Sequence, residues 1–182
     1  MNNRMLDKVA KPFNVELPEA EGLDDMIGKI LPAIRPHSED LREQEFYLKR
    51  NWIEIRDDED FHEVILHVFD EDGEYVRVVD GNIECGEWRI MNGKFVFGPS
   101  SCDAEVYELV FLDEEFFILT KHGNYRKFDR RFLVFIIEPL FKKLNWHEAM
   151  EFLFDKYRNT NSFFITITIL LVLIIGIVLM LS

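Results

Sequence analysis

The stretch GEWRIMNGKFVF, residues 86–97, holds the clearest local folding signal in this chain of 182 residues. Apolar and polar residues alternate on both sides of Asn92-Gly93. Such a pair is typical of two-residue β-hairpin turns, because both central positions of a type I′ turn need a positive φ. The stretch therefore predicts two antiparallel strands joined by a tight turn.

The same periodicity of two continues on both sides of this hairpin, and the breaks carry turn residues such as Asp72-Gly73 and Asp80-Gly81. Connections this short require antiparallel neighbours. We expect a mainly β fold, an antiparallel meander of seven or eight strands that curls into a barrel or half-barrel, because an open edge invites aggregation. The predicted strands are residues 52–56, 63–69, 74–79, 83–91, 94–97, 104–112 and 115–121, and residues 132–137 form either an eighth strand or the start of a helix.

The run DEDGEYVRVVDGNIECGEWRIMNGKFVF, followed by YELVFLDEEFFILTK, resembles the small bacterial lipocalin-like domains. In those domains an opening Trp strand leads to a D-G-x-Y hairpin, a G-x-W strand, an N-G-K turn and a closing pair of strands. The resemblance covers roughly residues 46–121, although this chain opens with Arg50-Asn51-Trp52 where lipocalins usually have G-x-W. It implies a cup that holds an apolar molecule, and it implies no catalytic residues. The matching positions are Trp52, Asp72, Gly73, Tyr75, Gly86, Trp88, Asn92, Gly93 and Lys94.

A pleckstrin-homology-like barrel is the alternative architecture, because it also has seven strands followed by one C-terminal helix. The sequence NWHE predicts the start of such a helix, since Glu148 lies three residues after a capping Asn145. A helix at about residues 145–158 that plugs an open corner of the sheet would favour this alternative. A helix that leads straight into a bilayer would favour the lipocalin-like barrel.

Residues 1–45 form a lead-in that differs from the strands, with four prolines and the acidic stretch ELPEAEGLDD. Within it, an apolar stripe at helical spacing predicts an amphipathic helix at residues 22–34 that packs on the body of the domain. Ser38 is placed to cap a second short helix that ends near Lys49-Arg50. The stripe consists of Leu23, Met26, Ile27, Ile30, Leu31 and Ile34.

Residues 163–181 contain no charged side chain and predict a transmembrane helix of about 28 Å, close to the roughly 30 Å hydrocarbon thickness of a bilayer. Lys156 and Arg158 precede it, so the positive-inside bias places residues 1–160 in the cytoplasm. The N-terminal residues lack an apolar signal segment. We therefore expect a single-pass, tail-anchored protein of the bacterial inner membrane. Its β-meander domain, 46–144, is joined to the anchor by a juxtamembrane helix, 145–160.

The formal net charge of −13 is unevenly distributed along the chain. Residues 1–120 carry 29 acidic and 12 basic side chains, which argues against nucleic acid as a partner. Residues 121–143 carry seven basic and two acidic side chains. We expect Arg126, Lys127, Arg130 and Arg131 to contact anionic lipid headgroups. The alternative is an internal ion-pair network between this basic stretch and the acidic body.

The sequence contains no recognisable motif for catalysis or metal binding. His62 and His67 are spaced one residue wider than in a zinc-protease H-E-x-x-H, and on a strand they would face opposite sides. Cys85 and Cys102 lack C-x-x-C spacing, and we expect them to be reduced thiols. The sequence therefore predicts no metal site and no cofactor.

These observations favour a non-enzymatic binding module, facing the cytosol, that recruits a protein partner or an apolar ligand at the membrane. A homo-oligomer is compatible with the sequence, since residues 115–121 are apolar on both faces. The alternative is a membrane-tethered enzyme with a carboxylate site in the β-cup, for which Glu84, Glu87 and Glu108 are the candidates. A buried carboxyl group with a raised pKa in a pocket would favour the enzyme.

Overall fold

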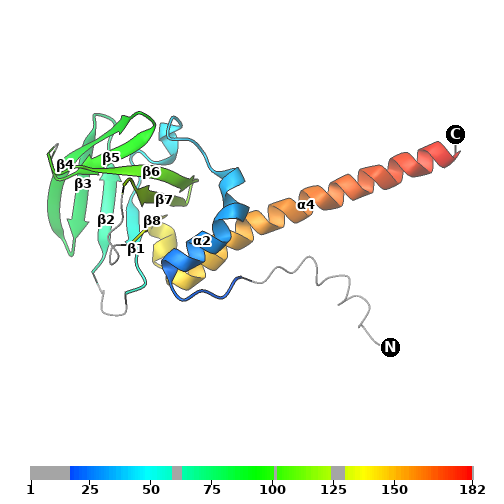
Figure 1. The fold of residues 1–182 in the computed structure, drawn as a ribbon, viewed down its shortest axis with the longest axis horizontal. Coiled ribbons are helices and arrows are strands. Elements are labelled where there is room, and N and C mark those ends of the chain that lie inside the picture. Colours follow the sequence, from blue (N-terminus) through cyan, green and yellow to red (C-terminus); the bar gives the residue numbers. More distant parts are fainter. Residues whose placement is uncertain (1–16, 59–62, 101, 124–129, 182) are drawn as a thin grey trace.

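Eight strands form a closed antiparallel barrel in the computed structural model, which describes residues 17–58, 63–100, 102–123 and 130–181 (Figure 1). Each strand pairs with its neighbours in sequence, and the last strand returns to the first. The strands are β1 (Trp52–Ile55), β2 (Ile65–Phe69), β3 (Glu74–Val79), β4 (Asn82–Met91), β5 (Lys94–Gly98), β6 (Glu105–Leu112), β7 (Phe116–Lys121) and β8 (Phe132–Ile137). The helices are α2 (Leu23–Ile34), α3 (Glu138–Phe141) and α4 (Trp146–Leu181), with short 3₁₀ turns η2 (Arg35–His37) and η3 (Gln44–Phe46).

The predicted meander is confirmed, and residues 132–137 are a strand. In the β1–β8 pair, Trp52 lies opposite Ile137 and Ile55 lies opposite Val134, which closes the cylinder. A closed cylinder has no open corner for a helix to plug, and α4 packs against its outside instead. The pleckstrin-homology-like alternative is therefore not what the structure shows, and the eight-stranded closed barrel is compatible with a lipocalin-like one.

The turn that joins β4 to β5 has the predicted backbone conformation. Asn92 has φ 51° and Gly93 has φ 74°, so both central residues lie in the left-handed region. Met91 and Lys94 pair directly across the turn. Asp80-Gly81 forms the equivalent turn between β3 and β4. These positive φ values fix the register of both hairpins.

Aromatic side chains fill the interior of the barrel. Alternate residues of each strand point inward, and many of their rings meet edge to face, as Phe69 and Phe95 do at 4.9 Å between centroids, while others stack. Tyr47, between η3 and β1, closes one end: its hydroxyl donates to the carbonyl of Leu41, and its own carbonyl accepts from the Trp52 indole. The buried interior residues are Leu41, Tyr47, Trp52, Phe69, Tyr75, Trp88, Phe95, Phe97, Tyr107, Leu112, Phe117, Leu119 and Phe135.

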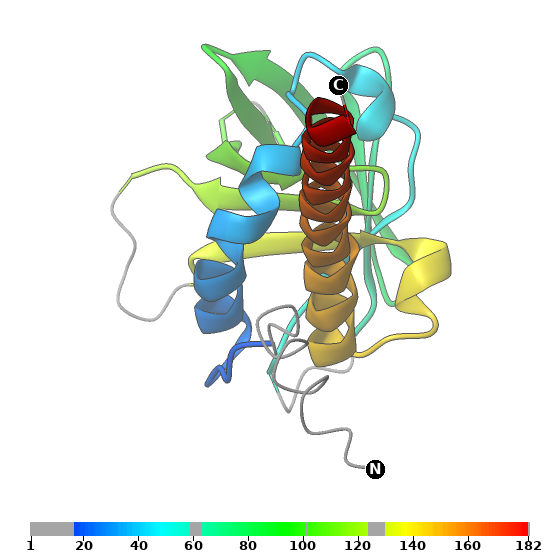
Figure 2. The same cartoon turned by 90° about the vertical axis from the view of Figure 1, so that its right-hand side faces the viewer.

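A second apolar core lies outside the barrel, where α2 and α4 run side by side against β1, β7 and β8 (Figure 2). The predicted stripe of α2 is confirmed as the packed face, with Leu31 only partly buried. Strands β1 and β7 contribute to both cores, which explains why they are buried on both faces. From the helices this core takes Leu23, Met26, Ile27, Ile30, Ile34, Ala149, Met150, Leu153 and Phe154.

Polar contacts fix the start of α4 and its position on the barrel. Asn145 and Glu148 form the predicted capping box, in which each backbone N–H donates to the other residue's side chain at 2.9 Å. Further along, buried Asp113 in the β6–β7 turn accepts from Lys156 Nζ at 3.0 Å and from the Tyr157 hydroxyl at 2.6 Å. The turn between two barrel strands is thereby tied to α4.

The backbone of α4 continues as a single helix to Leu181 and extends away from the barrel (Figure 1). Most side chains of the predicted transmembrane segment, 163–181, lie outside the described residues. Among the residues that are described, no helix is both long enough and apolar enough to cross a bilayer.

The second short helix expected after Ser38 does not form. The segment has only the 3₁₀ turn η3, and the Ser38 hydroxyl accepts from the Leu112 backbone N–H at 3.0 Å. Glu39 N–H donates to the Leu112 carbonyl at 2.8 Å. The prediction was wrong because this segment bonds to the side of β6, and that bonding satisfies backbone groups that a helix would otherwise use.

The β4–β5 turn gives a direct test of the register. Replacing Gly93 by Val should lower the free energy of unfolding by about 1–3 kcal/mol, because a β-branched residue at positive φ is strained. A Cβ at Gly93 meets nothing within 4 Å, so the backbone alone is tested. Gly93→Asn is the matched control and should lose much less, because Asn tolerates this region. Equal urea midpoints for wild type and Gly93→Val would contradict the turn assignment.

Candidate functional site: the barrel mouth

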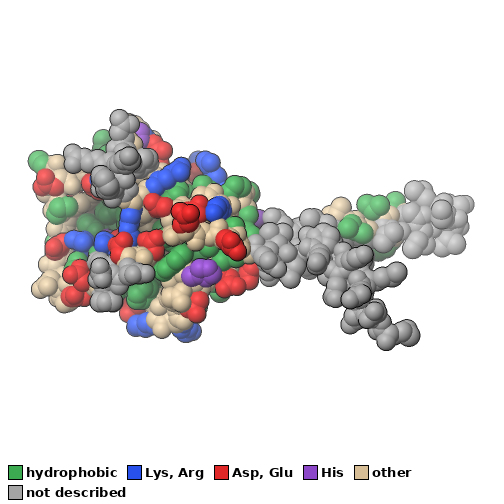
Figure 3. Space-filling model, turned by 60° about the horizontal axis from the view of Figure 1, so that its bottom comes forward, with side chains coloured by type: hydrophobic (Ala, Val, Ile, Leu, Met, Phe, Trp, Pro, Cys, Tyr) green, Lys and Arg blue, Asp and Glu red, His purple; other side chains and the backbone are tan. Residues whose placement is uncertain are grey.

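The end of the barrel opposite Tyr47 is a polar hollow of about 360 Å³, here called the mouth. Figure 3 looks toward this end and shows blue and red side chains gathered around a hollow with a green floor. The floor includes Phe97, Tyr107 and Leu133, and charged side chains form the walls. The barrel thus changes from an apolar interior to a charged opening along its axis.

Strand alternation explains how charged residues reach the interior. Glu54 is two residues after Trp52 on β1, and His67 is two residues before Phe69 on β2. Each therefore points to the same inward side of its strand as a buried aromatic ring. Glu105 has the same relation to Tyr107 on β6. Because these strands begin or end at the mouth, their polar residues gather there.

Three buried side chains form a hydrogen-bonded chain at the mouth. The Tyr75 hydroxyl lies 2.7 Å from His67 Nδ1, and His67 Nε2 lies 3.3 Å from Glu54 Oε2. Glu54 Oε1 accepts from Arg56 Nε at 2.6 Å. His67 and Glu54 are only 3% and 8% exposed. An ionised carboxylate can only accept, so Nε2 carries the imidazole proton and Nδ1 accepts from the tyrosine hydroxyl.

Burial and hydrogen bonding set the charges of this chain. Burial lowers the pKa of His67, and the neighbouring Glu54 only partly offsets this effect. Burial alone would raise the pKa of Glu54, but hydrogen bonds from His67 and Arg56 outweigh it and hold the pKa below its ordinary value. At neutral pH the pair is therefore a neutral imidazole bonded to a carboxylate, with Arg56 as the counter-ion. The raised carboxyl pKa that would favour an enzyme is not found at Glu54.

Two further polar groupings line the mouth. The Tyr107 hydroxyl donates to Glu105 Oε2 at 2.5 Å, and Lys121 Nζ bonds the other oxygen of that carboxylate. Arg77 donates to Glu84 at 2.9 Å on the rim. Burial raises the pKa of Tyr107, and the bond to Glu105 adds to this effect. In the described part of the chain, no three His, Cys, Asp or Glu side chains come together as metal ligands.

The basic residues predicted to contact lipid fall into two groups. Arg130 forms ion pairs with Asp57 and Asp58, and Arg131 lies with its guanidinium 4.9 Å from the Phe132 ring centroid. Both line a hollow of about 370 Å³ that adjoins the mouth. Arg126 and Lys127 lie outside the described residues. The lipid contact stays a prediction, and Arg130 also takes part in the internal ion pairing given as its alternative.

The three carboxylates proposed for an enzyme are not brought together. Glu84 lines the mouth, whereas Glu87 is exposed on β4. Glu108 pairs with Lys94 and His122 at a separate position, beyond the residues that line the mouth. Two carboxylates of the mouth were missed: Glu54, which is buried, and Glu105, whose exposed side chain lines the opening.

A signal for them was present in the sequence. Glu54, His67 and Glu105 each lie two positions from an aromatic residue on a predicted strand. A polar residue in phase with a buried aromatic ring faces the interior. Applying this rule would have placed Glu54, His67 and Glu105 on the inward face of their strands without a motif.

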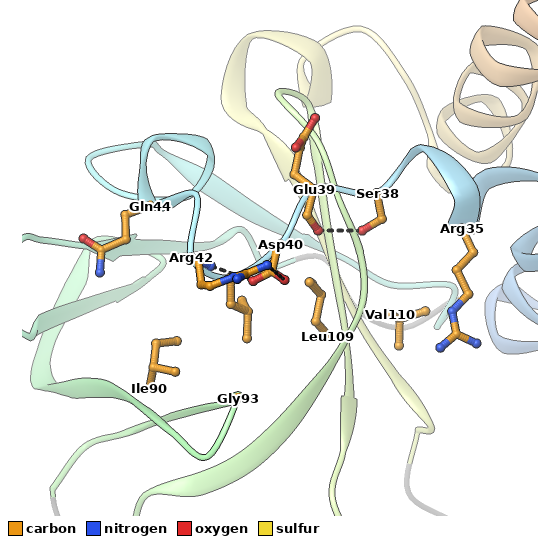
Figure 4. A pocket seen from close by; sticks show the side chains of 11 residues that line it. Arg35, Ser38, Glu39, Asp40, Arg42, Gln44, Ile90, Gly93, Leu109 and Val110 are labelled. Carbon is orange, nitrogen blue, oxygen red and sulfur yellow. Dashed lines mark hydrogen bonds and ion pairs between the residues drawn. The ribbon is translucent and has the colours of Figure 1, made fainter.

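A second hollow of about 720 Å³ lies between residues 35–44, the β4–β5 hairpin and β6 (Figure 4). In Figure 4, Ile90 and Gly93 lie on the hairpin side, and Asp40 and Arg42 pair with each other on the opposite side. Its charged residues are exposed. Because water can solvate them there, this groove lacks the buried polar groups that single out the mouth.

In comparisons with known proteins, no family model, curated protein or solved structure matches this chain.

The buried histidine predicts a pH dependence of stability. With its folded pKa lowered, neutral His67 contributes stability that is present above its ordinary pKa of 6.5 and is lost as the pH falls toward the folded value. As the pH falls below about 6.5, this residue should reduce the free energy of unfolding by up to about 1.4 kcal/mol per pH unit. Glu54 contributes with the same sign, but only at lower pH, because its ordinary pKa is 4.5.

His67→Gln removes the titrating group and keeps a polar side chain, so urea midpoints measured across this range should fall less steeply in the variant than in wild type. Comparing slopes cancels any constant loss of stability in the variant. Parallel curves would show that His67 is not held neutral by burial.

Proposed function

We propose that this chain is a non-enzymatic binding module held at the cytoplasmic face of a membrane, with its ligand site at the barrel mouth. The observation that carries the proposal is the chain of Glu54, His67 and Tyr75, which is buried beside a cavity. Burying an ionised carboxylate is costly, and apolar residues of similar volume would stabilise this end of the barrel as well or better. Polar groups kept at such a place are a mark of function.

The ligand is assigned to the mouth because the rest of the interior is occupied. Rings of Phe69, Phe95 and Phe117 lie within 4.9–6.2 Å of one another between centroids, at the position where a lipocalin-like cup would hold an apolar molecule. A lipocalin-like relationship remains part of the proposal, supported by the quoted motifs and the closed barrel. The protein partner expected from the sequence stays a prediction.

The membrane location is supported by two observations. Residues 163–181 carry no charge, and the α4 backbone is helical through them to Leu181. The barrel contacts of α4 described above end at Tyr157. The proposal therefore places a single-pass anchor in the distal part of α4, in the bacterial inner membrane, with residues 1–160 in the cytoplasm.

A membrane-tethered enzyme is the second candidate. It is favoured by the hydrogen-bonded order Tyr75, His67, Glu54, in which a carboxylate orients an imidazole. The neutral state of His67 would suit a general base. A bound small molecule recovered chemically altered would favour this candidate over the binding module.

Removal of residues 160–182 tests the anchor. The full chain should remain in the membrane fraction after a high-salt wash, whereas the shortened chain should be recovered in the soluble fraction. Circular dichroism of the shortened chain should remain β-rich, because the strands pair only with one another. A full chain released by salt, or a shortened chain still bound to membrane, would contradict the proposed anchor.

Vesicle binding by the shortened chain tests the basic stretch. Co-sedimentation with anionic vesicles should exceed that with neutral vesicles and should weaken with salt. It should fall in a variant with Arg126, Lys127, Arg130 and Arg131 changed to Gln. A variant with Lys142 and Lys143 changed to Gln is the control for general loss of positive charge. A shortened chain that binds neither kind of vesicle would assign the basic stretch to internal ion pairing.

A further inference from the structure

The polar atoms deep in the mouth are oriented as hydrogen-bond acceptors. The Tyr75 hydroxyl donates to His67, and the Tyr107 hydroxyl donates to Glu105, so both hydroxyl hydrogens are directed at protein partners. The hydroxyl oxygens keep lone pairs, and ionised Glu54 and Glu105 can only accept. A ligand that reaches this depth therefore meets acceptors and needs donors of its own.

The net charge of the residues that line the mouth also favours a ligand that donates hydrogen bonds. Four carboxylates line the cavity against two guanidinium groups, those of Arg56 and Arg77. The adjoining hollow adds three cations, those of Lys121, Arg130 and Arg131. Arg130 is held by two further carboxylates, Asp57 and Asp58, so six carboxylates face five cations over both hollows. Burial keeps the nearby imidazole of His67 neutral, so it does not balance the excess. The mouth is thus a site of net negative charge.

Aromatic rings supply a surface that suits an organic cation. Phe97 and Tyr107 stack at 4.8 Å between centroids on the floor, and Tyr75 meets Phe97 edge to face at 5.1 Å. The faces of such rings attract cations, more strongly where water is excluded. A metal ion is not favoured at this site, because the described side chains do not form a ligand cluster for one.

We propose that the mouth binds a small organic cation with a primary ammonium group. The ammonium donates to the acceptors around Glu54, Tyr75 and Glu105, and its alkyl part lies on the ring of Phe97. This inference rests on the proposed function of the mouth as a ligand site, and it adds the chemical class of the ligand.

Two arginines in the lining suggest the opposite interpretation, in which the mouth binds a carboxylate. Each guanidinium is already held by a carboxylate of the protein, Arg56 by Glu54 and Arg77 by Glu84. Bound to either guanidinium, an anionic ligand would lie close to that carboxylate and within the excess of negative charge in the mouth. A cation instead meets more carboxylates than cations in the lining, which is why the geometry favours it.

The test compares two probes of equal length and opposite charge, n-butylammonium and butyrate, titrated calorimetrically into the full chain in a neutral detergent at low salt. Butylammonium should bind and butyrate should not. Glu54→Gln should weaken butylammonium binding about tenfold or more, as expected for the loss of one charge-assisted hydrogen bond. Glu105→Gln, at a less buried carboxylate, should also weaken binding and guards against misfolding of the first variant.

Glu108→Gln is the matched control, because Glu108 is also a paired carboxylate on a strand but does not line the mouth. Its affinity for butylammonium should equal that of wild type. Butyrate binding that is lost in Arg77→Gln would overturn the cation assignment while supporting the mouth as a ligand site. Binding of neither probe, or butylammonium binding that is equal in all folded variants, would overturn both the ligand class and the mouth as its site.

Discussion

The pairing of β1 with β8 is the constraint on which the rest of the structure depends. Four residue pairs, from Trp52–Ile137 to Ile55–Val134, turn a flat meander into a cylinder. Closure removes the two exposed edges that an open sheet would leave. It also creates two separate environments, one inside the cylinder and one on its outer wall, and the remaining elements are distributed between them.

Strand β1 shows how one short segment serves both environments. Trp52 and Glu54 face the interior, while Ile53 and Ile55 face α2 and α4. All four residues of the strand are buried, although one of them, Glu54, is ionised. A single polar residue on this strand sets the boundary between the aromatic interior and the charged mouth.

Local turn chemistry made most of the fold predictable. Asn92-Gly93 and Asp80-Gly81 specify hairpins without reference to distant residues, and the capping box at Asn145 specifies a helix start in the same way. Ser38 was misjudged because its bond is to Leu112, which is distant in sequence.

The site was less predictable for the same reason. Glu54, His67 and Tyr75 come from three neighbouring strands, β1, β2 and β3, and meet only when these strands pair in register, which no motif within the sequence records. Only the phase of each residue relative to its neighbouring aromatic ring was visible beforehand. The ion pairs of Arg130 with Asp57 and Asp58 are a product of barrel closure, since they join the segments before β8 and after β1.

The unbroken course of α4 has a mechanical consequence. A flexible linker lets a domain turn freely above a bilayer, but a continuous helix transmits tilt and rotation from one end to the other. From Tyr157, which bonds to the barrel through Asp113, to residue 163 is a rise of only about 9 Å. With the distal part of α4 held in lipid, as proposed above, the barrel would keep a fixed height and orientation. Neighbouring molecules would then meet it by diffusion in two dimensions, with its mouth presented at a constant angle.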